Sequence, residues 1–550
     1  MLKRKHIFIA TGLAAVATRA VFAAFFAKSL FRFYHLLRGL DMESLLRFSQ
    51  WGGEDYPVSP FFTFHRVMIY LFWKLNMHQH NVMLIYAVQT ISGILAALAV
   101  TDIALMLTGK RRSSLICGLF YALYLPFMVY EFSVLKETFA INSFLFAVWA
   151  LLRMRKHHFC WKWSFFAGVL FGISLLGRPA AILLLPTFPA VIWLYCRRKN
   201  FRRKSVLIYL GGAALILLSA SIFNTAFGWK AGPFYDVISY TNQSNAAESA
   251  IAAAAQGNGA VPVKPSLFLT VKNAVKRVPQ LFSAREVPEN VNIYFWKEKI
   301  PDLAIFPGPE WLLPPALFAI GVLLAAGRFR NREFLLVYVI LLLALPLCAR
   351  TVIGRYRLML CPFLIITAVT GIRYFFTLHG LRKLLPPLLT GSCAAALSLY
   401  GLDAEKNLHP TDYLNWANAN EIHYGTKDQR TRDAFYAYWQ KSSFKNSKAF
   451  YEIQRVAMQS GDEALAIKTI KEAAAVQAVE PNLFFYCCAL VHARNEDAPG
   501  VWMFLSQIRE PQKLPADIQD EYRKMHNITV RIMQNMQKKG LNIKPKRIIL

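Results

Sequence analysis

The sequence predicts an all-α polytopic membrane protein that carries a helical soluble domain after its last span. The chain has 550 residues, of which 55% are hydrophobic and 14% aromatic. This composition is too apolar for a soluble multidomain protein, and the chain is too long for a single span. Six clusters of Lys and Arg are separated by pairs of apolar runs, at Lys3–Lys5, Lys110–Arg112, Arg153–Lys162, Arg197–Lys204, Arg328–Arg332 and Arg373–Lys383. Short loops rich in Lys and Arg stay cytoplasmic, so each pair of runs should cross out and back.

About eleven apolar runs come close to the ~20 residues that a helix needs to cross a bilayer. They lie at 7–28, 82–107, 113–130, 138–152, 163–178, 180–196, 205–224, 311–327, 333–349, 358–376 and 384–402. The first run also resembles a signal peptide that ends in a small-residue cleavage site, but its apolar character continues to Leu30, which favours an uncleaved span. With the N-terminus in the cytoplasm, an odd number of spans places the C-terminal part outside.

Two domains follow from this topology, a transmembrane domain at 1–402 and a soluble helical domain at 403–550. The second has about 150 residues, a normal domain size, and it is charged and lacks long apolar runs. Its residues 447–478 and 481–508 have the pattern of amphipathic helices, and the residues from Gly461 to Ala466 resemble a tetratricopeptide-type hairpin.

The transmembrane domain has two large non-cytoplasmic loops, at 29–80 and 225–310. Residues 61–75 of the first loop are apolar and aromatic with helical spacing, which predicts an interfacial helix along the membrane.

Charge and cysteine usage argue against two other classes of function. The formal net charge is +31, but most of the excess lies in short loops between apolar runs, where topology explains it, so nucleic-acid binding is not expected. No CxxC motif or Cys/His metal spacing occurs. The sequence leaves a divalent metal open without indicating one, and it points to no other cofactor.

Acidic residues follow the first span on the predicted outer side, as Asp41, Glu43, Glu54 and Asp55. A carboxylate close to the membrane surface can act as general base on a substrate that is carried by a lipid. The alternative is an ordinary solvated loop, which charge alone does not exclude.

The turn between the third and fourth spans carries Glu131, Lys136 and Glu137. Charged residues at a membrane boundary usually point into a protein cavity, because facing lipid is costly. A purely structural pair between Lys136 and one of the two acids is the alternative.

Arginines interrupt apolar stretches at positions that the topology does not place in the cytoplasm. Arg178 lies between Gly177 and Pro179, which break the helix, and Arg355, Tyr356 and Arg357 precede a late span. An anionic lipid phosphate is a ligand that would explain both groups.

The large loop 225–310 contributes a mixture of polar and aromatic residues before the next span. Glu286 and Asn290 are followed by the aromatic stretch from Ile293 to Trp296. These aromatics could line a site or form an interfacial belt.

The order of these features over residues 1–376 resembles the GT-C class of glycosyltransferases that use polyprenyl-phosphate sugars, in the branch of protein mannosyltransferases and aminoarabinose transferases. The matching pieces are Asp41-Met-Glu43, Tyr56 to Pro60, Tyr130-Glu131, Leu135-Lys136-Glu137, Gly177-Arg178-Pro179, Glu286 to Asn290 and Arg355-Tyr356-Arg357-Leu358. In that family the Asp of the first loop is the catalytic base, and the resemblance gives this role to Asp41. The family's common acid pair appears here as Asp41-Met-Glu43. Residues 403–550 lie outside the resemblance.

The resemblance implies a GT-C-like arrangement of spans and an inverting hexosyl- or pentosyltransferase in the plasma or inner membrane. Its donor would be a polyprenyl-phosphate sugar, and its acceptor a protein, lipid or cell-envelope glycan on the non-cytoplasmic face. The catalytic residues would be Asp41 and Glu43. The residues expected to bind substrate are Glu54, Asp55, Glu131, Lys136, Glu137, Arg178, Glu286, Asn290, Arg355, Tyr356 and Arg357.

Two alternatives belong to other classes of function. A polytopic transporter or lipid flippase predicts ionisable residues within the spans and inverted repeats, and the two halves of the sequence show no convincing repeat. A membrane scaffold would use the helical domain to bind partners, but it leaves the outer acids and arginines unexplained.

Overall fold

The computed structural model describes most of the chain as helices and short connections, and no strand occurs in this described part. The described residues are 3–37, 82–154, 160–177, 202–226, 277–285, 291–326, 354–399, 409–444, 446–476 and 479–541, with a few single positions besides. The chain divides into two compact units. Unit 1 comprises Met1–Ser29 and Arg38–Asn407, and unit 2 comprises Leu30–Leu37 and Leu408–Leu550.

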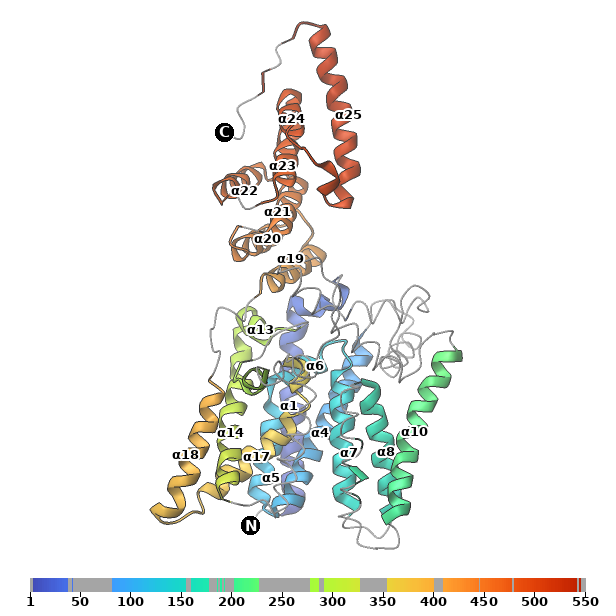
Figure 1. Cartoon of the computed structure of the whole chain (residues 1–550), viewed down its shortest axis with the longest axis vertical. Helices are drawn as coiled ribbons and strands as arrows, with labels where there is room; N and C mark the ends of the chain where they lie inside the picture. Colours follow the sequence, from blue (N-terminus) through green and yellow to red (C-terminus); the bar gives the residue numbers. More distant parts are fainter. Residues whose placement is uncertain are drawn as a thin grey trace, which may run out of the picture. The chain divides into compact units, whose positions relative to one another are not determined.

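Unit 1 is a bundle in which long apolar helices run side by side (Figure 1). Its first half contains α1 (Arg4–Lys28), α4 (Met83–Thr108), α5 (Arg111–Leu123), α6 (Leu125–Glu131), α7 (Glu137–Met154), α8 (Cys160–Gly177) and α10 (Arg202–Ala226). Its second half contains α13 (Ile293–Lys299), η5 (Pro301–Ile305), α14 (Pro309–Ala325), α16 (Gly354–Arg357), α17 (Cys361–Phe375) and α18 (Leu381–Leu397).

Five described helices are long and apolar enough to cross a membrane, and α5 with α6 makes a sixth if the bent pair counts as one broken span. These helices make the chain a multi-pass membrane protein. The prediction of about eleven spans is not confirmed. Two of the predicted spans, 180–196 and 333–349, fall almost wholly outside the described residues, and α8 and α17 are apolar but short.

The break between α5 and α6 follows from Pro126 at the second position of α6. Proline has no backbone N–H, so the carbonyl of Ala122 four residues earlier loses its helical partner. Two side chains of α1 take its place: Thr18 Oγ1 donates to this carbonyl at 3.0 Å and Arg19 Nη1 at 3.2 Å. The bend of 49° is therefore stabilised by hydrogen bonds from a neighbouring helix.

Asp102 marks the end of unit 1 where basic residues gather. Its carboxylate accepts from Arg4 near the start of α1 at 3.1 Å and from Arg153 near the end of α7. Three of the predicted basic clusters, those at Lys3–Lys5, Lys110–Arg112 and Arg153–Lys162, thus begin at one end of the bundle. That this end faces the cytoplasm stays a prediction.

Unit 2 is a succession of packed helices with a short segment from the start of the first loop. Its elements are η1 (Leu30–Leu36), α19 (Pro410–Tyr424), α20 (Gln429–Lys441), α21 (Ser447–Ser460), α22 (Glu463–Val476), α23 (Pro481–Arg494), α24 (Ala498–Leu505), η7 (Pro511–Lys513) and α25 (Ala516–Lys538). Gly461 ends α21 with a φ of +84°, a conformation that glycine adopts without strain. The two predicted amphipathic stretches are therefore each a pair of helices, and the tetratricopeptide relationship stays a prediction.

The short helix η1 packs on α19 within unit 2. The rings of Phe31 and Trp416 lie 5.2 Å apart, and Phe33 stacks on His423 at 5.1 Å. Tyr34 is buried, and burial together with the nearby carboxylate of Asp412 raises the pKa of its hydroxyl well above the usual value. The start of the predicted first loop is thus part of the helical unit's core.

Candidate functional site

The candidate site lies at the end of unit 1 that is opposite to Asp102. Gln89, near the start of α4, donates from Nε2 to the carbonyl of Ser133 at 2.9 Å, so the turn between α6 and α7 lies at this end. This turn, at 132–136, separates Glu131 from Glu137, two of the acids that the sequence singles out. Lys136, half-buried, offers its carbonyl to the amide of Ala140 at 3.1 Å and so opens α7.

Glu131 forms a buried bidentate ion pair with Arg19 of α1. Arg19 donates from Nε at 2.8 Å and from Nη2 at 2.6 Å, and both side chains are almost fully buried. A forked pair of this kind is the strongest geometry between these two groups. The pair joins α1 to the end of α6.

Gly93 of α4 makes room for the Glu131 carboxylate. A Cβ at this position would lie 1.9 Å from Glu131 Oε1, which no side chain could tolerate without displacing the ion pair. Glycine at this position therefore leaves the carboxylate in place in its ion pair.

Glu137 opens α7 with a carboxylate that is completely buried. The positive end of the helix dipole favours negative charge there. Arg355 of α16 places Nη1 3.7 Å from Glu137 Oε1. This distance is an ion pair but is too long for a hydrogen bond between the two groups. Residues more than two hundred positions apart are thus brought together at one end of the bundle.

Arg357 lies two residues further on, and its side chain is 1% exposed. It donates from Nη1 to the carbonyl of Ser283 and, at 3.3 Å, to that of Arg285. The amide of Ala284 in turn donates to the carbonyl of Ser398 at 2.7 Å. Arg357 therefore binds the described end of the large loop to the core of unit 1.

The aromatic residues before α14 belong to the interior of unit 1. Asn292 caps α13 by accepting from the amides of Tyr294 and Phe295, at 3.1 and 3.3 Å. Trp296, 2% exposed, stacks on Phe22 of α1 with ring centroids 6.2 Å apart. The alternative of an interfacial belt is therefore wrong for Phe295 and Trp296, because both are buried against protein.

The structure thus brings four of the predicted residues to one end of the bundle: Glu131, Lys136, Glu137 and Arg355. Arg357 adjoins them through α16. The backbone of Tyr356 lies in α16, and its side chain is outside the described part. Outside the described residues altogether lie Asp41, Glu43, Glu54, Asp55, Arg178, Glu286 and Asn290, as does the predicted interfacial helix at 61–75.

Three residues with structural roles were missed at the level of sequence. Arg19 and Asp102 lie within apolar runs, where an ionisable residue is costly unless it is paired, and that cost is the signal that could have singled them out. Nothing in the sequence singles out Gly93, because the small residue matters only through the position of Glu131 in the folded protein.

Comparison with known proteins gives one finding. Residues 60–223 match the family model of dolichyl-phosphate-mannose-protein mannosyltransferases. The matched stretch, less than a third of the chain, contains Glu131, Lys136, Glu137 and Arg178 and excludes both Asp41 and Arg355. No curated protein and no solved structure matches the chain. The family match and the apolar helices together support a membrane glycosyltransferase.

The described part of the site carries more cationic side chains than carboxylates. Its cationic side chains Arg19, Lys136, Arg355 and Arg357 outnumber the carboxylates of Glu131 and Glu137. Among the described residues, no three His, Cys, Asp or Glu side chains gather as metal ligands would. Guanidinium groups hold phosphates through several charge-assisted hydrogen bonds, so this end of the bundle is chemically suited to a phosphate.

Proposed function

We propose that the protein is an inverting glycosyltransferase that takes one sugar from a polyprenyl-phosphate carrier and transfers it to an acceptor on the non-cytoplasmic face. Asp41 removes a proton from the acceptor as the acceptor oxygen or nitrogen attacks the anomeric carbon. The bond from that carbon to the phosphate oxygen breaks, and the carrier leaves as its phosphate. Glu43 orients the acceptor or a neighbouring group.

The observation that carries this proposal is the family match over residues 60–223, which contains the turn with Glu131 and Glu137. The structure supports the proposal by placing Arg355 next to this turn, although Arg355 lies outside the match. The carboxylate of Glu137 and the guanidinium of Arg355, from distant parts of the sequence, therefore meet where the family resemblance expects substrate.

In the proposed mechanism the arginines stabilise the leaving phosphate. Negative charge develops on the phosphate oxygens as the sugar departs, and fixed cations at that point lower the barrier. Arg355 and Arg357, with Arg178, would supply this charge. The ion pair of Arg19 and Glu131 has a positioning role, because it ties α1, which leads into the first loop, to the end of α6.

The role of the second unit is proposed from its place in the chain. It would bind the acceptor or a partner on the same face as the first loop, because η1, which begins that loop, is packed within it.

The decisive experiment replaces Asp41 by Asn in the full-length protein. The change keeps the size of the side chain and removes the basic oxygen, so sugar transfer from a polyprenyl-phosphate donor should fall by roughly 10²-fold or more. Glu54→Gln and Asp55→Asn are the comparison variants in the same loop, and both should lose less activity than Asp41→Asn, because these residues are expected to bind substrate rather than to take the proton. Normal transfer by Asp41→Asn beside an inactive Glu54→Gln or Asp55→Asn would show that another carboxylate is the base.

A transporter or flippase remains the second candidate, and one observation favours it. Arg19 and Asp102 are ionisable residues within membrane helices, as that function predicts. Both are engaged in close ion pairs, which fits structural roles equally well. Movement of a labelled polyprenyl phosphate across vesicles, with full activity of all four amide variants at Asp41, Glu43, Glu54 and Asp55, would select the transporter.

A further inference from the structure

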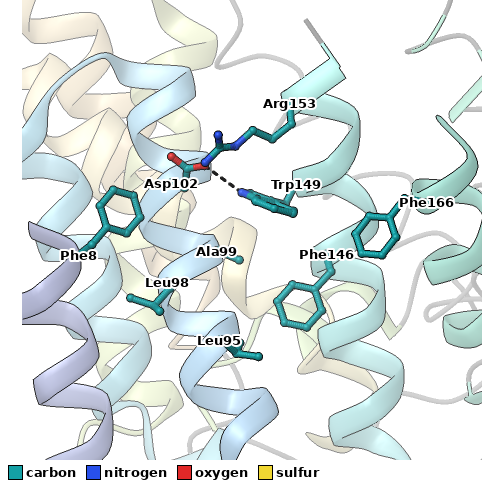
Figure 2. A pocket seen from close by; sticks show the side chains of 9 residues that line it. All are labelled: Phe8, Leu95, Leu98, Ala99, Asp102, Phe146, Trp149, Arg153 and Phe166. Atoms are coloured by element: carbon teal, nitrogen blue, oxygen red, sulfur yellow. Dashed lines mark hydrogen bonds and ion pairs between the residues drawn. The ribbon is translucent and has the colours of Figure 1, made fainter. Parts of the chain in front are cut away.

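A cavity of about 340 Å³ opens between four helices and extends to the basic end of unit 1, and none of its lining residues belongs to the candidate site. Figure 2 shows Asp102, Trp149 and Arg153 at one end of this cavity and Leu95 at the other. Its volume is within the range of small-molecule sites. The apolar side chains that line it are Phe8 of α1, Leu95, Leu98 and Ala99 of α4, Phe146 of α7 and Phe166 of α8.

The walls of the cavity are suited to a hydrocarbon chain. Leu95 and Asp102 are seven residues apart on one helix, so the cavity runs for about 10 Å along α4. Leu95 is 51% exposed and Phe166 of α8 is 44% exposed, which makes the apolar part accessible from the side of the bundle. In a membrane helix this side faces lipid.

The polar end of the cavity is cationic. Asp102 is 2% exposed and accepts from Trp149 Nε1 at 2.9 Å, from Arg4 Nη2 at 3.1 Å and from Arg153 Nη2. One carboxylate thus faces two guanidinium groups, and no other acid lines the cavity among the residues that the structure describes. Half of the Arg4 side chain and about a quarter of that of Arg153 remain exposed.

The guanidinium of Arg153 has a donor that is not used in its hydrogen bond to Asp102. Its Nε is buried and makes no hydrogen bond with any residue that the structure describes. Its guanidinium also lies over the ring of Trp149, 5.2 Å from the centroid, which holds it at the rim of the cavity.

We propose that this cavity binds an anionic phospholipid of the membrane, with one acyl chain between α4, α7 and α8 and the headgroup phosphate at Arg153 and Arg4. The apolar walls of the cavity account for binding of the acyl chain. The excess of cationic groups at its polar end accounts for the preference for an anionic headgroup over a zwitterionic one. The exposed cluster at Lys110–Arg112 follows directly on α4 and adds to the positive charge of this end. The site is independent of the transferase proposal.

The test uses the full-length protein in nanodiscs of phosphatidylcholine. One sample carries phosphatidylglycerol with a photoactivatable group on its acyl chain, and a second carries the same group on phosphatidylcholine. After illumination, mass spectrometry of peptides should find the label on residues 95–99 and 146–153. The phosphatidylglycerol probe should exceed the phosphatidylcholine probe there by about fivefold, the factor that one guanidinium near a membrane surface confers.

Two variants separate the apolar and the charged parts of the site. Ala99→Leu fills the cavity and should reduce labelling of these peptides to the level of other lipid-facing peptides. Ile91→Phe on the same helix is the control, because Ile91 is 58% exposed and lies outside the cavity. The triple variant Arg4→Gln/Asp102→Asn/Arg153→Gln removes both proposed phosphate ligands together with their carboxylate, which avoids an unpaired buried charge, and should remove most of the preference for phosphatidylglycerol.

Equal labelling by the two probes in the unchanged protein would overturn the anionic preference. Labelling that survives in Ala99→Leu would show that the probe does not occupy the cavity. If Ala99→Leu does not fold, Ala99→Val adds less volume and is judged by the same criterion.

Discussion

At the scale of single residues, buried charges carry much of the structure of unit 1. Arg19 and Glu131 satisfy each other with two hydrogen bonds, and Gly93 leaves the space that their carboxylate occupies. A pair of this kind contributes little net free energy when it is complete, but it leaves a costly unpaired charge when one partner is lost.

Removal of Arg19 should therefore destabilise the protein strongly. Arg19→Ala leaves Glu131 without its cation, at a cost of about 3–5 kcal/mol, and thermal unfolding in detergent should show a clear decrease in Tm. The double variant Arg19→Met/Glu131→Gln should recover much of the loss, because no charge remains unpaired. Lys5→Ala, at an exposed position of the same helix, is the control and should unfold like the original protein. An unchanged Tm in Arg19→Ala would contradict the role of the pair.

The proposed binding of the donor phosphate by Arg355 can be tested by comparing an uncharged replacement with a charged one. Arg355→Ala should weaken use of a polyprenyl-phosphate donor, seen as a raised KM for the donor. Arg355→Lys should restore it only in part, because a single ammonium lacks the planar fork of guanidinium. The pair of variants separates this role from simple neutralisation of Glu137, which lysine would also supply. Donor affinity that is normal in Arg355→Ala would remove Arg355 from the proposed site.

At the scale of elements, two features depend on partners that are remote in sequence. The bend between α5 and α6 begins with Pro126, but the freed carbonyl of Ala122 is satisfied only because Thr18 and Arg19 of α1 lie beside it. In the same way η1 is ordered by α19, through the contacts of Phe31 with Trp416 and of Phe33 with His423.

The packing of η1 can be tested with neighbouring residues of opposite burial. Phe31 is 2% exposed, so Phe31→Ala should cost about 3–5 kcal/mol locally and make residues 30–37 accessible to protease. Arg32 is exposed, and Arg32→Ala should leave the protease pattern unchanged. The measurement is limited proteolysis of the full-length protein with mass analysis of the cut sites. The same cleavage in both variants would show that Phe31 does not anchor this segment.

At the scale of the whole molecule, topology is the prediction on which the proposed site depends. We expect residues 29–80, 225–310 and 403–550 to share the non-cytoplasmic side, because all six basic clusters lie outside these three regions, one before the first and five between them. Cysteines introduced at Gly53, Gly257 and Gly425 should react with a membrane-impermeant reagent added from outside. A cysteine at Thr108, close to the basic end of α4, should react only after the membrane is opened. Reaction of any of the first three only from the cytoplasm would exclude a shared external site.

Much of the architecture was predictable from sequence, because the formation of a membrane helix depends on properties of the segment itself. Whether a segment is a membrane helix depends on its own composition and length, so apolar runs at 7–28, 82–107 and 138–152 closely predict α1, α4 and α7. The change in composition after residue 403 likewise predicts a stretch of amphipathic helices. The number of spans depends on segments such as 180–196, and there the prediction of eleven stays open.

The composition of the site was predictable only in part. By itself the sequence singled out four charged residues beside apolar runs, because a charge that faces lipid is costly and such residues usually point into the protein. They are Glu131, Glu137, Arg355 and Arg357. Only the tertiary structure decided the pairing: Glu131 binds Arg19 rather than its sequence neighbour Lys136, and Glu137 lies against Arg355. It also decided that Asp102 joins Arg4 to Arg153 beside an apolar cavity. The physical reason is that hydropathy is a property of each segment, whereas a buried charge is satisfied by whichever group the packing of helices brings within hydrogen-bonding distance.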